Sequence, residues 1–152
     1  MIATSQDVLD RFRVGVTNIP VVICRGDTVL RNPTNAEIAD CLGLNEQIDQ
    51  TRVSDLVIVG GGPAGLAAAV YGSSEGLDVL VLESNVPGGQ AGSSSRIENY
   101  LGFPTGISGL DVAGRAYAQP MKFGAHVIVA RGATRFFCDG QHYMVECRRV
   151  AG

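Results

Sequence analysis

The residues best suited to bind a ligand form one glycine-rich run, Gly60-Gly61-Gly62-Pro63-Ala64-Gly65. Gly60, Gly62 and Gly65 have the G-x-G-x-x-G spacing, in which the first glycine permits a sharp turn, the second admits a pyrophosphate and the third allows close packing of a helix on a strand. A helix that starts in this run directs free N–H groups and the positive end of its dipole toward phosphates. The run contains no lysine, so we expect a dinucleotide site and not a P-loop.

A carboxylate lies at the distance that this kind of site requires. Glu83 follows Gly65 by 83 − 65 = 18 residues and stands at the end of an apolar segment. A carboxylate in this place accepts hydrogen bonds from ribose hydroxyls, and it repels the 2′-phosphate of NADP. Glu83 therefore predicts ribose binding and disfavours NADP at this site, although the glycine run and the acid do not separate FAD from NAD.

The segments around the run predict a β-α-β unit. Residues 55–59 are apolar after the first, as expected for a parallel strand that is buried on both faces. Residues 63–75 predict a helix rich in alanine that ends at Gly76, and residues 77–82 predict the next strand. These elements place the glycine run between the first strand and the helix, and they place Glu83 at the end of the second strand.

The segment after Glu83 is long and irregular. Residues 84–106 are rich in Gly, Ser and Pro, and loops of this length in compact domains are usually functional. Residues 108–123 predict a helix that Pro120 should kink or shorten. Residues 127–129 predict a third strand, and residues 134–138 and 143–147 predict a hairpin around Asp139-Gly140.

The first fifty residues predict a smaller α/β piece. Residues 8–12 are expected to be helical, and residues 19–24 and 28–30 predict two strands joined by a turn at Gly26-Asp27. A second helix should begin with Thr34 or Asn35 as its N-cap and end at Gly43. Residues 45–52 are polar and predict a linker.

The four cysteines give no sign of a metal or redox motif. They occur at positions 24, 41, 138 and 147, without a CxxC pair or the Cys/His spacing of a zinc site. We expect buried free thiols in a reducing compartment, with Cys24 in the core. A disulfide between Cys138 and Cys147 across the hairpin is the alternative that the sequence leaves open. We identify no metal ligand, and we expect His126 and His142 to be surface or packed residues.

Composition excludes several classes of function. The formal net charge is −3 and the Lys and Arg residues form no basic block, so we expect no nucleic-acid partner. The apolar runs are too short to span a bilayer, and the first residues lack the pattern of a secretory signal. The default expectation is a cytoplasmic protein with no membrane contact.

Three short motifs in the loop after Glu83 carry a family resemblance: Pro87-Gly88-Gly89-Gln90, Arg96-Ile97-Glu98-Asn99-Tyr100 and Gly102-Phe103-Pro104. Together with the glycine run, they resemble the thioredoxin reductase-like, FAD-dependent family of pyridine nucleotide-disulfide oxidoreductases, from about residue 55 to 150. The resemblance implies FAD as cofactor, with Gly89, Gln90 and Asn99 at its flavin end. An amide both donates and accepts hydrogen bonds, as flavin edges and ribityl hydroxyls require. The alternative is that Gln90 and Asn99 only cap loop backbone.

The N-terminal piece resembles the C-terminal half of a thioredoxin or glutaredoxin fold. Pro20, in Asn18-Ile19-Pro20-Val21-Val22, stands where that fold has a cis-proline, although an ordinary trans proline at a strand start is the alternative. Some flavoprotein reductases carry such a domain before the FAD-binding part. The first half of the fold and its active cysteine are missing, so the resemblance implies no redox activity here.

These observations predict an α/β chain with two parts. Residues 1–50 form a partial thioredoxin-like domain plus linker, and residues 51–152 form the N-terminal part of an incomplete Rossmann-type FAD-binding domain. A second G-x-G-x-x-G for NADPH and a CxxC pair are missing, so the chain resembles a fragment. We expect it to bind FAD weakly or not at all by itself, and we identify no catalytic side chain.

The resemblance implies one function and leaves others open. In the full-length family, NADPH reduces FAD, which passes electrons to a disulfide or another acceptor; the partners would be a thioredoxin-like protein or a second subunit of a homodimer. One alternative is a non-catalytic module that binds FAD or a partner chain. Another is a fragment of an NAD-dependent dehydrogenase that uses the same β-α-β unit.

Overall fold

The computed structural model describes residues 4–45 and 53–147, and the chain divides into two compact units, Met1–Leu44 and Asn45–Gly152. We call them the N-terminal unit and the C-terminal unit. Most of the predicted linker, residues 46–52, lies outside the described residues. None of the described helices is long and apolar enough to cross a membrane.

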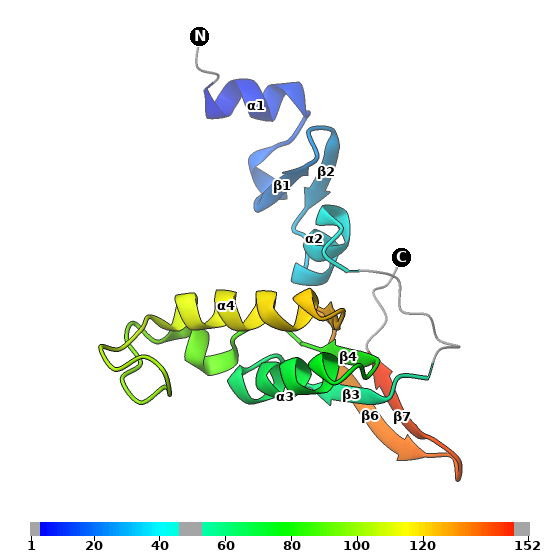
Figure 1. Cartoon of the computed structure of the whole chain (residues 1–152). Coiled ribbons are helices and arrows are strands. Elements are labelled where there is room, and N and C mark those ends of the chain that lie inside the picture. The colour runs from blue at the N-terminus through cyan, green and yellow to red at the C-terminus, as the bar shows by residue number, and fades with distance from the viewer. Residues whose placement is uncertain (1–3, 46–52, 148–152) are drawn as a thin grey trace. The chain divides into compact units, whose positions relative to one another are not determined.

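The N-terminal unit is a small hairpin flanked by short helices (Figure 1). Its elements are α1 (Ser5–Arg11), η1 (Val16–Asn18), β1 (Val21–Cys24), β2 (Thr28–Arg31) and α2 (Asn35–Leu42). Thr34 caps α2 and exchanges hydrogen bonds with Glu37, and Gly43 ends the helix in the left-handed conformation. The predicted boundaries of α2 are therefore confirmed, and the Ile19–Pro20 peptide bond is cis, as the resemblance implied.

The prediction that all four cysteines are free is wrong. A disulfide joins Cys24 at the end of β1 to Cys41 in α2, while Cys138 and Cys147 are free. Cys138 is exposed and Cys147 is half-buried, so neither is the buried thiol that we expected. The two half-cystines are 17 residues apart and belong to no motif, and only the packing of α2 against β1 brings them together.

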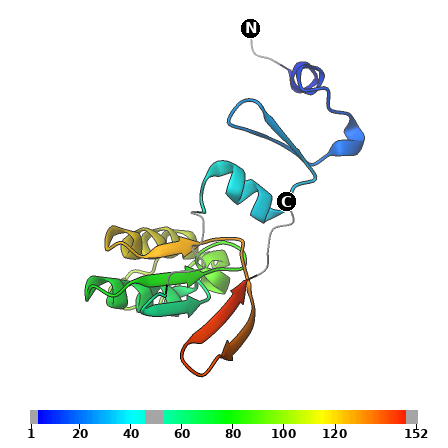
Figure 2. The ribbon, with the colours of Figure 1, turned by 90° about the vertical axis from the view of Figure 1, so that its right-hand side faces the viewer.

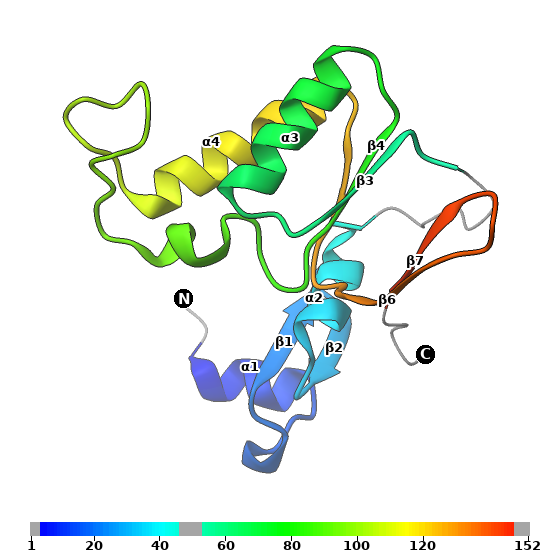
Figure 3. The same ribbon diagram turned by 90° about the horizontal axis from the view of Figure 1, so that it is seen from below.

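The C-terminal unit is built on a parallel sheet of the order β3-β4-β5. Helices α3 and α4 pack against one another on one face of this sheet (Figure 3). The elements are β3 (Leu56–Val59), α3 (Pro63–Ser74), β4 (Val79–Leu82), η2 (Gly89–Ser93), α4 (Gly109–Lys122), β5 (His126–Ile128), β6 (Ala133–Cys138) and β7 (Tyr143–Cys147). The predicted β-α-β unit with its parallel sheet is confirmed.

The expectation that residues 55–59 are buried on both faces is wrong. In β3 the side chains alternate, and those of Val57 and Val59 are 37% and 61% exposed. Strand β3 is at the edge of the three-stranded sheet, and the side chains that alternate with Val57 and Val59 face α3. Strand β4 is central, and Val79, Val81 and Leu82 are almost fully buried.

Helix α4 differs from its prediction, whereas the predicted C-terminal hairpin is confirmed. Helix α4 continues through Pro120 to Lys122, so the proline does not shorten it; Pro120 is in the last turn, where its missing N–H costs one hydrogen bond. The hairpin of β6 and β7 projects as a separate ribbon (Figure 2). Its strands are joined by residues 139–142, and the Asp139 carboxylate accepts hydrogen bonds from the N–H groups of Gln141 and His142.

The edge of the sheet at β5 meets a side chain instead of another strand. The Asn45 side chain donates from Nδ2 to the carbonyl oxygen of Val129 (3.0 Å), and its Oδ1 accepts from the N–H of Val129 (2.8 Å). Val129 directly follows β5 and is buried. The amide of Asn45 thus satisfies both backbone groups of one residue, as a neighbouring strand would.

Candidate functional site

The glycine run forms the turn between β3 and α3, as predicted. Gly60 has φ = +105°, a conformation that only glycine adopts easily, and its N–H donates to the carbonyl oxygen of Leu82. Gly62 is the N-cap of α3, and Pro63 occupies the first turn, where a missing N–H is harmless. A Cβ at Gly65 would overlap with the carbonyl oxygen of Gly60. The turn is therefore closed on its inner side.

The outer side of the same turn is open. A Cβ built at Gly62 meets nothing within 4 Å, in contrast to Gly65. The N–H groups of the first turn of α3 have no intrahelical acceptor and carry the positive end of the helix dipole. The turn thus presents backbone to an empty space that suits a phosphate group.

Glu83 is bound to the glycine turn. Its side chain is 6% exposed, and Oε2 accepts from the N–H of Gly61 at 2.6 Å. Oε1 accepts from the N–H of Asn85 at 2.7 Å and from the hydroxyl of Ser84 at 3.4 Å. A carboxylate oxygen can accept more than one hydrogen bond, so Oε2, which accepts one here, keeps a lone pair for a ribose hydroxyl. The sequence predicted the position of Glu83 but not its contacts with Gly61 and Asn85.

The loop after β4 returns to the same turn. The N–H of Gly88 donates to the carbonyl oxygen of Gly61 at 2.7 Å, and a Cβ at Gly89 would lie 3.3 Å from Cα of Gly62. Gly88 and Gly89 both have positive φ, which explains the pair of glycines. Gly88 was not among the predicted site residues, although the double glycine was the signal for it. The structure therefore brings together the glycine run, Glu83 and Gly89.

Gln90 and Asn99 are placed differently. Both side chains are exposed, and within the described residues neither side-chain amide forms a hydrogen bond. The alternative, in which both amides cap loop backbone, would require a hydrogen bond from each amide to the backbone, and the described residues contain none. Asn99 lines a shallow surface cavity formed by residues 98–104. The loop around it is braced by paired backbone bonds between Ile97 and Ile107 and by the bond from Arg96 to the carbonyl oxygen of Thr105.

A second shallow cavity lies between the two helices of the C-terminal unit. Its walls come from α3, α4 and the loop that precedes α4: Leu66, Ala67, Val70, Tyr71, Tyr100, Ala116 and Gln119. None of the predicted cofactor residues contributes to it. The open backbone at Gly62, and not this cavity, is therefore the candidate site.

Comparison with known proteins agrees with this geometry. Residues 58–142 match the family model described as NAD(P)-binding Rossmann-like domain. The thioredoxin reductase of Bacillus subtilis is 37% identical over 98 residues, which are 64% of this chain and 30% of that protein. The thioredoxin reductase of Ureaplasma parvum is 46% identical over 77 residues, 51% of this chain and 25% of that protein.

Solved structures give the same result. The thioredoxin reductase of Lactococcus lactis superposes with a TM-score of 0.59 at 30% identity, over 62% of this chain and 31% of that one. The thioredoxin reductase of Streptococcus pyogenes superposes with a TM-score of 0.59 at 33% identity, over 64% of this chain and 31% of that one. The resemblance to thioredoxin reductases is therefore confirmed, and the chain spans between a quarter and a third of the length of the relatives named here.

Proposed function

The chain belongs to the family of NAD(P)-binding Rossmann-like domains, and on this premise we propose that its C-terminal unit binds FAD. The observation that carries the proposal is the β3–α3 turn, which is closed behind Gly65 and open at Gly62. The pyrophosphate of the cofactor would lie at Gly60, Gly61 and Gly62, at the start of α3 with Pro63 and Ala64. Glu83 would accept hydrogen bonds from the adenosine ribose.

The flavin end would lie along the loop that follows β4. Gly89 packs against Gly62, so a cofactor on the glycine run would reach this loop next. Gln90 and Asn99 are exposed and have no hydrogen bond within the described residues, so their amides are available to a ligand. We assign both to the flavin and ribityl groups, as the resemblance to thioredoxin reductases implies.

The reaction proposed for the whole protein is that of a thioredoxin reductase-like flavoprotein. Bound FAD would supply a hydride acceptor that passes electrons onward, and the residues of this unit would bind and orient it. NADPH as electron source, a thioredoxin-like acceptor and a homodimer partner belong to the same proposal. The cytoplasmic location also stays a prediction.

A titration of the full chain with FAD, FMN and NADH tests the cofactor assignment. Flavin fluorescence and absorbance report FAD and FMN, and NADH has its own fluorescence. We expect FAD to bind weakly, in line with the expectation from the sequence, and FMN to bind more weakly still, because FMN lacks the adenosine and the second phosphate that the glycine run and Glu83 would hold. Tighter binding of NADH than of FAD would contradict the proposal and favour the dehydrogenase alternative.

Variants separate the two ends of the cofactor. Gln90→Ala should weaken FAD more than ADP, because only FAD has a flavin, whereas Glu83→Gln should weaken both. Gly114→Ala is the matched control, since a Cβ at Gly114 in α4 meets nothing within 4 Å and Gly114 is outside the site. Equal losses for FAD and ADP in the Gln90 variant would remove Gln90 from the flavin site. FAD binding without NADPH oxidation is expected both of a piece of a reductase and of a non-catalytic module, because the sequence has no second G-x-G-x-x-G for NADPH.

A further inference from the structure

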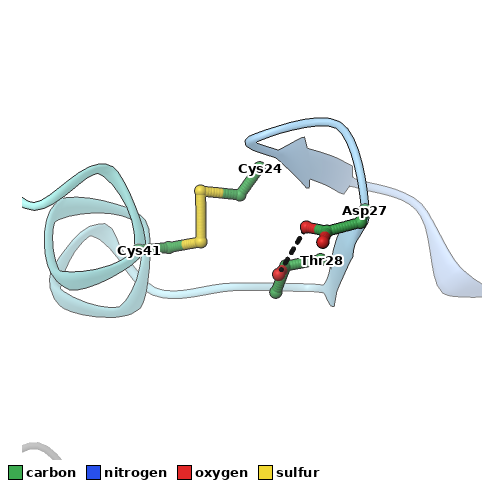
Figure 4. The surroundings of a disulfide bond; sticks show 4 residues. All are labelled: Cys24, Asp27, Thr28 and Cys41. Atoms are coloured by element: carbon green, nitrogen blue, oxygen red, sulfur yellow. Dashed lines mark hydrogen bonds between the residues drawn. A yellow bond between two sulfur atoms is a disulfide. The ribbon is translucent and has the colours of Figure 1, made fainter.

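The disulfide of the N-terminal unit connects its hairpin to its second helix. Cys24 is the last residue of β1 and pairs with Thr28 across the hairpin, while Cys41 is the penultimate residue of α2 (Figure 4). Their Cα atoms are 6.4 Å apart. Within the described part of this unit, the buried apolar residues are Val14, Cys24 and Ala39. The disulfide is therefore a large part of what holds α2 against β1.

The two sulfur-bearing residues differ in exposure. Cys24 is 2% exposed, whereas Cys41 is half-buried at the end of α2. A thiolate that attacks a disulfide must approach one sulfur along the S–S axis, so accessibility decides which sulfur is attacked. The near-complete burial of Cys24 therefore favours Cys41, the more exposed residue, as the side of the disulfide that a solvent thiol attacks.

A positive charge lies beside the C-terminal end of α2, the helix that carries Cys41. Arg25 follows Cys24 and has φ = +54°, and its Nη2 would lie 2.7 Å from a Cβ built at Gly43, two residues after Cys41. The guanidinium is thus beside the end of α2, and Arg25 is the residue that follows Cys24 in the sequence. A nearby cation favours the thiolate form of cysteine, and thus favours release of a thiolate during exchange. The carboxylate in the same hairpin, that of Asp27, accepts a hydrogen bond from the hydroxyl of Thr28 at 3.1 Å (Figure 4).

We propose that the Cys24–Cys41 disulfide is a redox site that exchanges with thiols in the folded chain, with Cys41 as the sulfur that is attacked. This inference concerns the N-terminal unit and goes beyond the FAD-binding function proposed for the C-terminal unit. It also differs from the sequence-based expectation that the N-terminal piece has no redox role. That expectation depended on the absence of a thioredoxin-type cysteine and did not include this pair.

The exchange is a balanced two-electron reaction with a dithiol donor. A donor thiolate attacks Sγ of Cys41, the Sγ–Sγ bond breaks, and its electron pair leaves on Sγ of Cys24, which then takes up a proton. The second donor thiol, as thiolate, attacks the donor sulfur of the mixed disulfide and releases Cys41, which is also protonated. The donor is oxidised to its disulfide, and the chain gains two electrons and two protons.

Glutathione is a monothiol, so the second step needs a second molecule of it, and rapid alkylation after a short reaction traps the mixed disulfide and identifies the attacked sulfur. The full chain with Cys138→Ser and Cys147→Ser is treated with reduced glutathione, alkylated and analysed by peptide mass spectrometry. We expect glutathione on Cys41 and the alkyl group on Cys24 in the folded chain, with a preference of roughly tenfold or more from the difference in access. In concentrated urea, the preference should fall to near one.

Two results would overturn the proposal. One is equal or greater labelling of Cys24 in the folded chain. The other is reduction that occurs only in urea, because the disulfide would then be an inert cross-link. Reoxidation of the reduced, otherwise wild-type chain with oxidised dithiothreitol gives a separate check. It should restore the Cys24–Cys41 disulfide. A product dominated by disulfides to Cys138 or Cys147 would also contradict the proposal. None of these measurements uses FAD, so they are independent of the cofactor assignment.

Discussion

Two glycines of the same turn have opposite surroundings, which gives a matched pair of variants. Gly65→Ala places a methyl group on the carbonyl oxygen of Gly60, so we expect a loss of about 1–3 kcal/mol in the free energy of unfolding. Gly62→Ala places its methyl group in open space and should change stability by less than about 0.5 kcal/mol. Urea denaturation measures both.

The same pair separates folding from binding. If a pyrophosphate approaches the backbone at Gly62, the methyl group of Gly62→Ala occupies its place, and FAD affinity should fall although stability does not. An unchanged affinity in this variant would mean that the cofactor lies elsewhere.

The two free cysteines should differ in reactivity. Burial raises the pKa of the Cys147 thiol, an effect that the charge of Arg131 partly offsets. Cys138 is exposed on the hairpin. In mildly alkaline buffer we therefore expect iodoacetamide to label Cys138 several-fold faster than Cys147, as followed by mass spectrometry, because only the thiolate reacts. The Cys138→Ser variant should leave one slow phase, and a fast phase in that variant would refute the assignment.

At the residue scale, the sequence predicts those parts of the site that depend on local backbone geometry. The glycine spacing and the distance to Glu83 are properties of a β-α-β unit, so the order of residues along the chain is enough to place both. The contacts of Glu83 with Gly61 and Asn85, and the pairing of Cys24 with Cys41, depend on how distant segments pack. No local pattern contains that information.

At the scale of elements, the cap of α2 makes a prediction about pH. The backbone N–H and the hydroxyl of Thr34 donate to the Glu37 carboxylate, in that order of effect, and lower its pKa from the ordinary 4.5. A lowered folded pKa means that the cap stabilises α2 above pH 4.5, and that this contribution is lost as the pH falls through the lowered value. Carboxyl NMR of Glu37 should give a titration midpoint below 4.5.

A variant of the cap tests the cause. Thr34→Ala removes the hydroxyl but keeps the backbone donor, so the pKa of Glu37 should move only part of the way back toward 4.5. The pKa of Asp7 in α1 is lowered by Thr4, first through its hydroxyl and then through its backbone N–H, and serves as the internal control, which Thr34→Ala should leave unchanged. A Glu37 pKa that does not respond to Thr34→Ala would exclude the hydroxyl as a cause.

The boundaries and burial of helices and strands are likewise predictable only where a local sequence signal determines them. Thr34 and Gly43 are strong local signals, and the sequence located both ends of α2 correctly. It was wrong about β3, because an apolar run does not reveal whether its strand is central or at an edge. It was also wrong that Pro120 shortens α4, because the helix continues to Lys122 although the ring removes one hydrogen bond.

At the scale of the molecule, the aromatic residues make the two units separately visible. The chain has no tryptophan, and its four tyrosines, at positions 71, 100, 117 and 143, all belong to the C-terminal unit. Reduction removes a cross-link over 17 residues, which should destabilise the N-terminal unit by about 3 kcal/mol. We expect far-UV circular dichroism to report a loss of helix while tyrosine fluorescence stays constant.

The serine variant Cys41→Ser should reproduce the effect of reduction, and Cys138→Ser should not. A change in tyrosine fluorescence on reduction would show that the two units unfold as one cooperative body. The division into units could be predicted from sequence only roughly, because composition marks a polar stretch but not the residue at which packing changes.

The bidentate amide of Asn45 has a consequence for the behaviour of the chain in solution. An open sheet edge recruits strands from other molecules, and here one side chain occupies the N–H and C=O groups of Val129 where such recruitment would begin. Asn45→Ala would uncover this hydrogen-bonding pair without touching the glycine turn. We expect the variant to self-associate at concentrations at which the wild type stays monodisperse, as measured by light scattering. Self-association of the variant would identify Asn45 as a residue that protects this sheet edge against aggregation.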